Sequence, residues 1–205
     1  VALYSTTVSS QQKDSVVAVH TTHEFEAAFN KISDNKVFKM LHIPVPLFAI
    51  SALTYSQGSK FRTMRNSYAP NFHYRYDDFL QYAPLAAVIG MKLGGVESRS
   101  SWGRMLASDA FAMTLMGITV NSMKYSIHRT RPDGSANNSF PSGHTATAFM
   151  AATIMHKEYG LTRSPLYSIG GYTVATATAF SRQLNNRHWL SDVLAGAGIG
   201  ILSTE

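Results

Sequence analysis

The amino-acid sequence predicts an all-α fold, because helix-length apolar segments separated by short polar loops recur along the chain. Alternation of apolar and polar residues, the pattern that predicts β-strands, is almost absent. The 205 residues are enough to bury a sizeable core without a disulfide or a metal ion. The absence of cysteine excludes disulfides, thiolate zinc sites, iron–sulfur clusters and a cysteine nucleophile.

The apolar segments predict helices over residues 23–32, 37–55, 77–92, 101–125, 142–158, 166–183 and 188–203. Loops are expected over residues 56–76, 94–100 and 131–140, where Gly, Ser, Asn and Pro are frequent. We expect residues 1–35 to form a polar N-terminal segment and residues 36–205 a single helical domain. The chain begins at Val1 rather than Met, which we interpret as the mark of a processed or trimmed chain.

The charge and hydropathy patterns indicate the classes of partner. The net charge is +6, but only 15% of the residues are charged, which is unlike the lysine-rich tail of a nucleic-acid-binding protein. Charged residues or prolines interrupt every apolar segment before it reaches a clean membrane-spanning length. We therefore expect a soluble or peripheral domain, with a membrane-embedded bundle as the alternative. The spacing of Gly196 and Gly200 is typical of membrane dimers, but tight packing inside a bundle is favoured.

Most of the residues that indicate a chemical function lie in three segments between residues 124 and 192. These segments are Lys124 to Pro132, Pro141 to His144, and Ser181 to Asp192. Lys124, Arg131 and Arg182 offer fixed positive charge, and the guanidinium groups match phosphate oxygens. Brought together, these segments predict an oxyanion pocket.

Ser142 and Gly143 open a predicted helix and extend this pocket. Ser142 adds a hydroxyl donor, and the backbone amides at a helix N-terminus attract negative charge. His188 and Asp192 are four residues apart in a predicted helix, so the carboxylate can orient the ring and leave one nitrogen free as a nucleophile. His144 has no acid at helical spacing and is expected to be the general acid.

The three segments match the pattern KxxxxxxRP, PSGH and SRxxxxxHxxxD at every specified position and in the same order. In this respect the chain resembles the superfamily of type 2 phosphatidic acid phosphatases, bacterial non-specific acid phosphatases and vanadium haloperoxidases. The resemblance implies a helical bundle of the acid phosphatase and vanadium haloperoxidase type. It also implies a phosphohistidine intermediate on His188, oriented by Asp192, with His144 protonating the leaving group. Lys124, Arg131, Ser142, Gly143 and Arg182 would then bind the phosphate.

The function expected from this resemblance is a metal-independent phosphatase that hydrolyses a phosphomonoester or pyrophosphate. The favoured substrate is a lipid phosphate of the bacterial envelope, met in the periplasm or at the membrane surface. No metal and no cofactor are expected, vanadate is the expected inhibitor, and nucleic acid is not an expected partner. A non-specific soluble acid phosphatase, a vanadate-dependent haloperoxidase and a non-catalytic protein that binds an anionic ligand are the alternatives.

Several charged residues lie near these motifs but outside the pattern. We expect His128, Arg129 and Arg187 to be solvated charges at helix ends. Asp77 and Asp78 lie at the N-terminus of the predicted helix over residues 77–92, where acids interact favourably with the helix dipole, and a place at the rim of the substrate mouth is the alternative. The connection over residues 133–140 is short, so we expect an open mouth suited to a bulky or lipid-borne phosphate.

Overall fold

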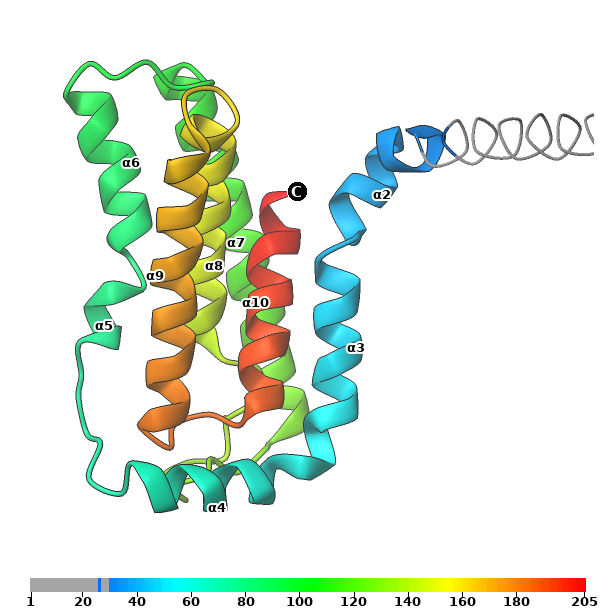
Figure 1. Cartoon of the computed structure of the whole chain (residues 1–205), viewed down its shortest axis with the longest axis vertical. Helices are drawn as coiled ribbons and strands as arrows, with labels where there is room; N and C mark the ends of the chain where they lie inside the picture. The colour runs from blue at the N-terminus through cyan, green and yellow to red at the C-terminus, as the bar shows by residue number, and fades with distance from the viewer. Residues whose placement is uncertain (1–25, 27–29) are drawn as a thin grey trace, which may run out of the picture. The chain divides into compact units, whose positions relative to one another are not determined.

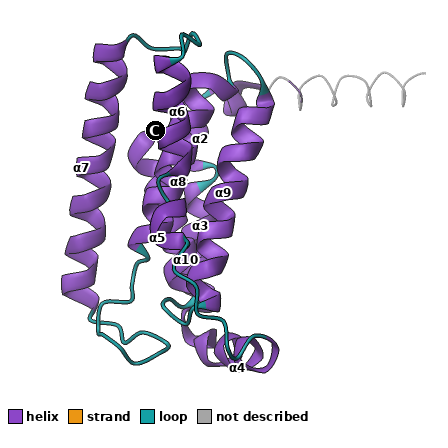
Figure 2. Cartoon of the chain, turned by 90° about the vertical axis from the view of Figure 1, so that its left-hand side faces the viewer, coloured by secondary structure: helices purple, strands orange, loops and turns teal. Residues whose placement is uncertain are grey.

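The computed structural model describes residue 26 and residues 30–205, and this part of the chain consists of helices joined by loops (Figure 2). It divides into two units, one up to His42 and one from Ile43 to the end. In the first unit the residues 30–34 are helical, and α2 (Lys36–Leu41) begins after Asn35, whose side chain accepts a hydrogen bond from the Val37 amide at 2.8 Å. Most of the helix predicted over residues 23–32 lies outside the described residues. The predicted domain boundary at residue 36 stays a prediction.

The second unit contains the helices that build the site. They are α3 (Pro44–Thr54), η1 (Tyr55–Gln57), α4 (Gly58–Tyr68), α5 (Asp77–Leu80), α6 (Ala83–Leu93), α7 (Trp102–Ile127), α8 (Gly143–Met155), the π-helical turn η2 (His156–Gly160), α9 (Pro165–Leu184) and α10 (Leu190–Thr204). Prolines explain two breaks in the predicted helices, because Pro44 lies in the first turn of α3 and Pro84 in the first turn of α6.

The loop predicted over residues 56–76 is wrong over residues 58–68, which form α4, whereas residues 69–76 are a loop as predicted. The α4 segment is polar on average, so its sequence resembles a loop. Its stability comes from tertiary contacts instead. The Arg65 guanidinium donates from Nε to the Leu184 carbonyl at 2.7 Å, and Gly58 packs directly against the Trp189 ring. In Figure 1, α4 runs across the lower end of the second unit.

The core forms around α8, which packs against α6, α7, α9 and α10 (Figure 1). One face of α8 contributes Ala146, Met150 and Ile154, which are buried together with Met116 and Ile199. Small side chains let the neighbouring helices approach closely. A Cβ atom at Gly196 would lie 2.5 Å from the Ser142 carbonyl oxygen, and one at Gly200 would lie 2.3 Å from that of Ala146. The preference for tight packing of these glycines inside a bundle is confirmed.

The direction of the helices places the motif segments together. Helices α7 and α9 end, and α8 and α10 begin, at the same lower end of the bundle in Figure 1. The loop over residues 128–142 and the turn over residues 185–189 connect them there. Among the helices of residues 26 and 30–205, none has both the length and the apolar character needed to span a bilayer.

Candidate active site

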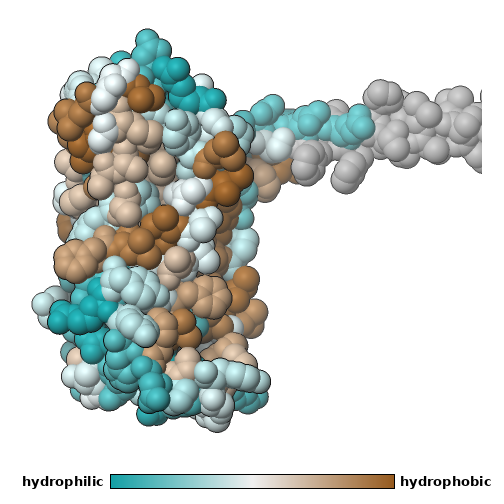
Figure 3. All heavy atoms as spheres, turned by 60° about the vertical axis from the view of Figure 1, so that its left-hand side comes forward, coloured by the Kyte–Doolittle hydropathy of each residue, from teal (hydrophilic) through white to brown (hydrophobic). Residues whose placement is uncertain are grey.

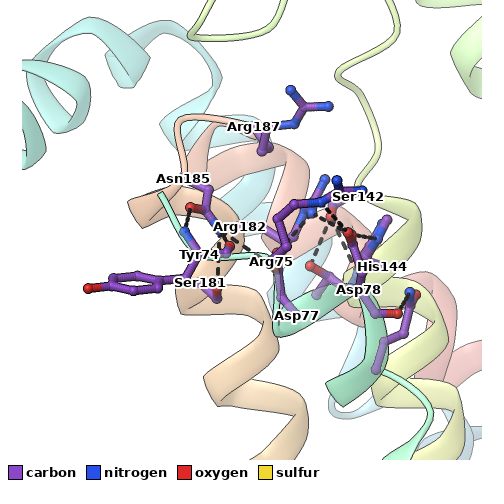
Figure 4. Close-up of polar contacts among 12 residues, drawn as sticks. Tyr74, Arg75, Asp77, Asp78, Ser142, His144, Ser181, Arg182, Asn185 and Arg187 are labelled. Carbon is purple, nitrogen blue, oxygen red and sulfur yellow. Dashed lines mark hydrogen bonds and ion pairs between the residues drawn. The ribbon is translucent and has the colours of Figure 1, made fainter. Parts of the chain in front are cut away.

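A cavity of about 590 Å³ opens at this end of the bundle. Its walls come from the loop before α5, from α5, from the loop after α7, from the start of α8 and from the turn after α9. The lining residues are His73, Tyr74, Arg75, Asp77, Asp78, Arg131, Asp133, His144, Arg182, Asn185, Asn186 and Arg187. Figure 4 shows that many of these side chains converge from different elements. The cavity is therefore rich in charge of both signs.

Arg182 forms the buried side of this cavity from the last turn of α9. Its residue surface is only 5% exposed, and its Nη1 atom lies 2.8 Å from Asp77 Oδ2 and 3.5 Å from Asp78 Oδ1. Asp77 is also fully buried, so the two charges compensate each other. The Nε atom of Arg182 is buried without a hydrogen-bond partner in the described part of the chain. This donor is available to an oxyanion.

His144 lies in the first turn of α8 and faces α5 (Figure 4). Its Nε2 atom lies 3.0 Å from Asp78 Oδ1, and Arg75 Nε holds the other carboxylate oxygen of Asp78 at 3.2 Å. Burial and the charge of Arg182 lower the pKa of His144, and Asp78 acts in the opposite direction. Asp78 is thus the acidic partner that local spacing around His144 did not reveal.

His188 is buried, with 3% of its surface exposed, and it precedes α10 rather than lying in it. Its Nδ1 atom lies 2.7 Å from the Ser139 carbonyl oxygen and 3.7 Å from Asp192 Oδ2. Because a carbonyl only accepts, Nδ1 carries the proton in this contact and Nε2 of the neutral ring keeps its lone pair. Burial lowers the pKa of His188 to about 4, although Asp192 acts in the opposite direction. The ring is therefore neutral near pH 7.

The expected direct hydrogen bond between His188 and Asp192 is replaced by contacts from several other groups. Asp192 Oδ2 accepts hydrogen bonds from the Trp189 amide at 2.9 Å and from the Ser139 hydroxyl. Burial would raise the pKa of Asp192, but His188, Ser139 and Arg129 outweigh it and hold the pKa below its ordinary value. Asp192 therefore acts on His188 as a nearby fixed negative charge.

The expectation that Arg129 is a solvated charge is wrong. Its side chain is 12% exposed and its Nη1 atom lies 2.7 Å from Asp192 Oδ1. The guanidinium also donates to the Ser191 hydroxyl and the Tyr55 carbonyl, and it stacks 3.8 Å from the centre of the Tyr55 ring. His128 is exposed as expected, whereas Arg187 is half-buried and pairs with Asp133 at 3.2 Å.

Lys124 and Arg131 are held by the same residue of the connecting loop. Lys124 Nζ donates to the Asn138 carbonyl at 2.6 Å, and Arg131 Nε donates to the Asn138 side-chain oxygen at 3.1 Å. Burial and repulsion by Arg131 lower the pKa of Lys124 to about 8. Burial and nearby arginines also lower the pKa of Arg131, a direction that marks a cluster of positive charge.

Ser142 caps the N-terminus of α8. Its hydroxyl oxygen accepts hydrogen bonds from the Thr145 hydroxyl at 2.9 Å and from the Thr145 amide at 3.4 Å, and its backbone amide donates to the Asp192 carbonyl at 2.9 Å. Helix geometry leaves the amide of Gly143 without an intrahelical acceptor. The hydrogen bond from the Ser142 amide to the Asp192 carbonyl joins the start of α8 to the first turn of α10.

The predicted site residues divide into two groups in the described part of the chain. Arg131, His144 and Arg182 line the large cavity, whereas Lys124, Ser142, Gly143, His188 and Asp192 are outside its lining. His188 instead lines a small cavity that shares Asn186 with the large one. The charges of Arg182 and Lys124 both act on His188, so the two groups form one electrostatic cluster.

Sequence reasoning missed the roles of Arg129 and Asn138, and it left open the role of Asp77 and Asp78. Both acids lie in the first turn of α5, as the helix N-terminal role predicts. Both also line the cavity, which agrees with the alternative of a place at the substrate mouth. A signal for Arg129 was present, because it lies between Lys124 and Arg131 in the first motif. For Asn138 and Asp78 no local spacing pointed to a partner.

A family model for the PAP2 superfamily matches residues 106–204, which include all three motif segments. The chain belongs to the PAP2 superfamily. A curated relative, the lipid A 1-phosphatase of Porphyromonas gingivalis, is 54% identical over 162 residues, which make up 78% of this chain. The chain spans 36% of the length of that relative.

Two similar solved structures confirm the all-α prediction. The transmembrane PAP2 type phosphatidylglycerolphosphate phosphatase of Bacillus subtilis matches with a TM-score of 0.59 and 20% identity, over 80% of this chain and 93% of that chain. Aquifex aeolicus LpxE matches with a TM-score of 0.50 and 21% identity, over 69% of this chain and 90% of that chain. At these identities the likeness concerns the fold.

Proposed function

We propose that the chain is a lipid phosphate phosphatase that transfers a phosphoryl group to His188 and then to water. The observation that carries this proposal is the state of His188. Its Nδ1 atom is bound by the Ser139 carbonyl, its ring is neutral, and positive charges of Arg182 and Lys124 act on it. A neutral imidazole whose Nε2 keeps its lone pair, with the positive charges of Arg182 and Lys124 acting on it, is suited to attack a phosphorus atom.

In the first step, Nε2 of His188 forms a bond to phosphorus, and the bond between phosphorus and the leaving oxygen breaks. The leaving oxygen keeps the electron pair and takes a proton from His144. Arg131, Arg182, Lys124, the Ser142 hydroxyl and the Gly143 amide would hold the phosphate oxygens and neutralise their charge. The unpartnered Nε of Arg182 supports this assignment, because a buried donor without an acceptor is costly until an anion arrives.

In the second step, water attacks phosphorus while the neutral His144 accepts a proton from it. The bond between phosphorus and His188 breaks, and its electron pair returns to Nε2. Both histidines end in their starting protonation states, and inorganic phosphate is released. The same pair of groups therefore serves both halves of the reaction.

The substrate that we propose is lipid A phosphate, on the basis of the name of the Porphyromonas gingivalis relative. Contact with a membrane surface is supported by exposed apolar side chains. On α7 they include Phe111, Leu115 and Ile118, which share one helix face and are 70%, 43% and 61% exposed. Figure 3 shows apolar, brown side chains over the middle and upper part of one face, with polar, teal ones at its top and near its lower end. We propose membrane association in the bacterial envelope.

The test is phosphate release from lipid A 1-phosphate in detergent, compared with phosphatidic acid, phosphatidylglycerophosphate, undecaprenyl pyrophosphate and a soluble sugar phosphate. We expect turnover in excess EDTA and inhibition by vanadate, which mimics the transition state of phosphoryl transfer. His188→Ala should reduce turnover by about 1,000-fold or more while phosphate binding persists, since the cations remain.

His156→Ala is the matched control, because His156 bonds Ser168 at 2.8 Å outside the cavity. We expect this variant to retain activity. Loss of turnover on chelation, or equal rates for His188→Ala and the unaltered chain, would contradict the proposed function. A preference for the soluble sugar phosphate would contradict the lipid substrate alone.

A further inference from the structure

Asp78 contacts three residues at the same time: His144, Arg182 and Arg75. Its Oδ1 atom lies 3.0 Å from His144 Nε2 and 3.5 Å from Arg182 Nη1, and its Oδ2 atom lies 3.2 Å from Arg75 Nε. About a third of the Asp78 side chain is exposed, so the carboxylate lies at the wall of the cavity. These contacts fix the carboxylate from two sides.

The position of this carboxylate depends on contacts between segments far apart in the chain. The Asn185 side chain donates to the Tyr74 carbonyl at 2.6 Å and accepts from the Tyr74 amide at 3.0 Å. This pair of bonds attaches the loop before α5 to the end of α9. The buried ion pair between Asp77 and Arg182 attaches α5 itself to α9. Asp78 is thereby held in place opposite His144 on α8.

We propose, on the basis of the proposed function, that Asp78 is a positioning residue that orients His144 and keeps it protonated until it delivers its proton to the leaving oxygen. Nε2 of His144 is the nitrogen that Asp78 contacts, so the entering substrate must displace or share this contact. Asp78 then returns the ring to the same place after each turnover. His188 and Asp192 form the nucleophilic pair, and His144 and Asp78 form the acidic pair.

The charges around His144 determine the sign of the expected effect. Asp77 and Asp78 of α5 favour the protonated ring, and Arg182 of α9 disfavours it. The same cavity is lined by the charged or titratable residues His73, Arg75, Arg131, Asp133 and Arg187. Burial lowers the pKa of His144, and removing Asp78 removes the nearest group that raises it. Without Asp78 the ring should lose its proton at a lower pH.

The test measures kcat/KM against pH for the unaltered chain and for Asp78→Asn. We expect Asp78→Asn to lower kcat/KM by about 10-fold near neutral pH and to move the alkaline limb of the profile toward lower pH. Asp78→Glu, which retains the charge, should keep the alkaline limb near its original place. Should Asp78→Asn fail to fold, Asp78→Ser takes its place with the same expected shift.

Asp133→Asn is the matched control, because Asp133 lines the same cavity and pairs with Arg187 rather than with His144. We expect its alkaline limb to stay near that of the unaltered chain. An equal shift in both variants would mean that the general charge of the cavity, and not the contact with Asp78, controls His144. A rise in kcat/KM in Asp78→Asn, with an unmoved limb, would mean that Asp78 competes with the phosphate, and it would overturn the proposal.

A second measurement separates this proposal from the proposed function. The His144 ring can be titrated by NMR with labelled histidine, and its signal can be identified by its loss in His144→Gln. We expect a lower pKa for His144 in Asp78→Asn than in the unaltered chain. If the unaltered chain releases no phosphate, the proposed function is wrong, and the titration still reports on the pair. If it releases phosphate and the titration is unchanged, only the role of Asp78 is wrong.

Discussion

The carboxylate of Asp192 is fully buried and depends on Arg129 to compensate its charge. Arg129 makes the ion pair at 2.7 Å and also binds the Ser191 hydroxyl and the Tyr55 carbonyl, so its own donors are well satisfied. An unpaired charge in such a place is expensive, because the protein interior solvates it poorly. The proposed nucleophilic pair of His188 and Asp192 therefore depends on a residue that is outside the family pattern.

At this scale we predict that Arg129→Met lowers the free energy of unfolding by about 3–5 kcal/mol, because it leaves Asp192 buried without its cation. Denaturant titration, monitored by circular dichroism, measures this change in the free energy of unfolding. Arg187→Met is the control, since the Arg187 side chain is 41% exposed and its pair with Asp133 should contribute at most about 1 kcal/mol. Equal losses in the two variants would show that Arg129 is not a buried partner of Asp192.

Among the elements, α8 and α10 determine the relation between two of the motifs. The amide of Ser142 at the start of α8 donates to the Asp192 carbonyl at the start of α10. Gly196 and Gly200 allow the two helix backbones to approach closely along the next turns. A larger residue at either position would push α10 away from α8 and would move His188 relative to Ser142.

We predict that Gly200→Ala destabilises the protein by about 1–3 kcal/mol, because the new Cβ would overlap the backbone of α8. Thermal unfolding measures the effect. Gly117→Ala in α7 is the matched control, since no atom lies within 4 Å of a Cβ at that position. Alanine there should stabilise the helix by about 0.5–1 kcal/mol. An unchanged melting temperature for Gly200→Ala would refute the close approach of α8 and α10.

For the molecule as a whole, the exposed apolar face of α7 is the surface that we propose to contact the membrane. We predict that Phe111→Asp combined with Ile118→Asp reduces binding to vesicles of phosphatidylethanolamine and phosphatidylglycerol by at least about tenfold, since each side chain contributes about 1.5–3 kcal/mol when buried. Sedimentation with the vesicles measures this binding. Hydrolysis of a soluble phosphate should be unaffected.

Thr63→Asp combined with Ser67→Asp is the control for the added charge. Both residues are exposed on α4, and the pair adds the same charge without removing an apolar side chain. Vesicle binding should stay within about twofold of the original value for this control. Equal binding by the unaltered chain and both double variants would mean that α7 does not contact the membrane.

The sequence alone determined the all-α fold class, because helical periodicity is a local property of the chain. It also determined that Lys124, Arg131, His144, Arg182 and His188 occur together in the pattern of one family. It did not reveal α4, whose sequence is polar on average and whose Arg65 and Gly58 contact the second half of the chain.

The tertiary structure decided which groups meet in the site. His144 and Asp78 are 66 residues apart, and Arg129 and Asp192 are 63 residues apart. No spacing within one helix encodes such pairs, since they depend on which helix ends the topology brings to the same end of the bundle. The Ser139 carbonyl that holds His188 is likewise a backbone atom, and any residue type would supply it. The sequence thus identified the side chains of the candidate site, whereas only the folded chain determined which groups contact each other.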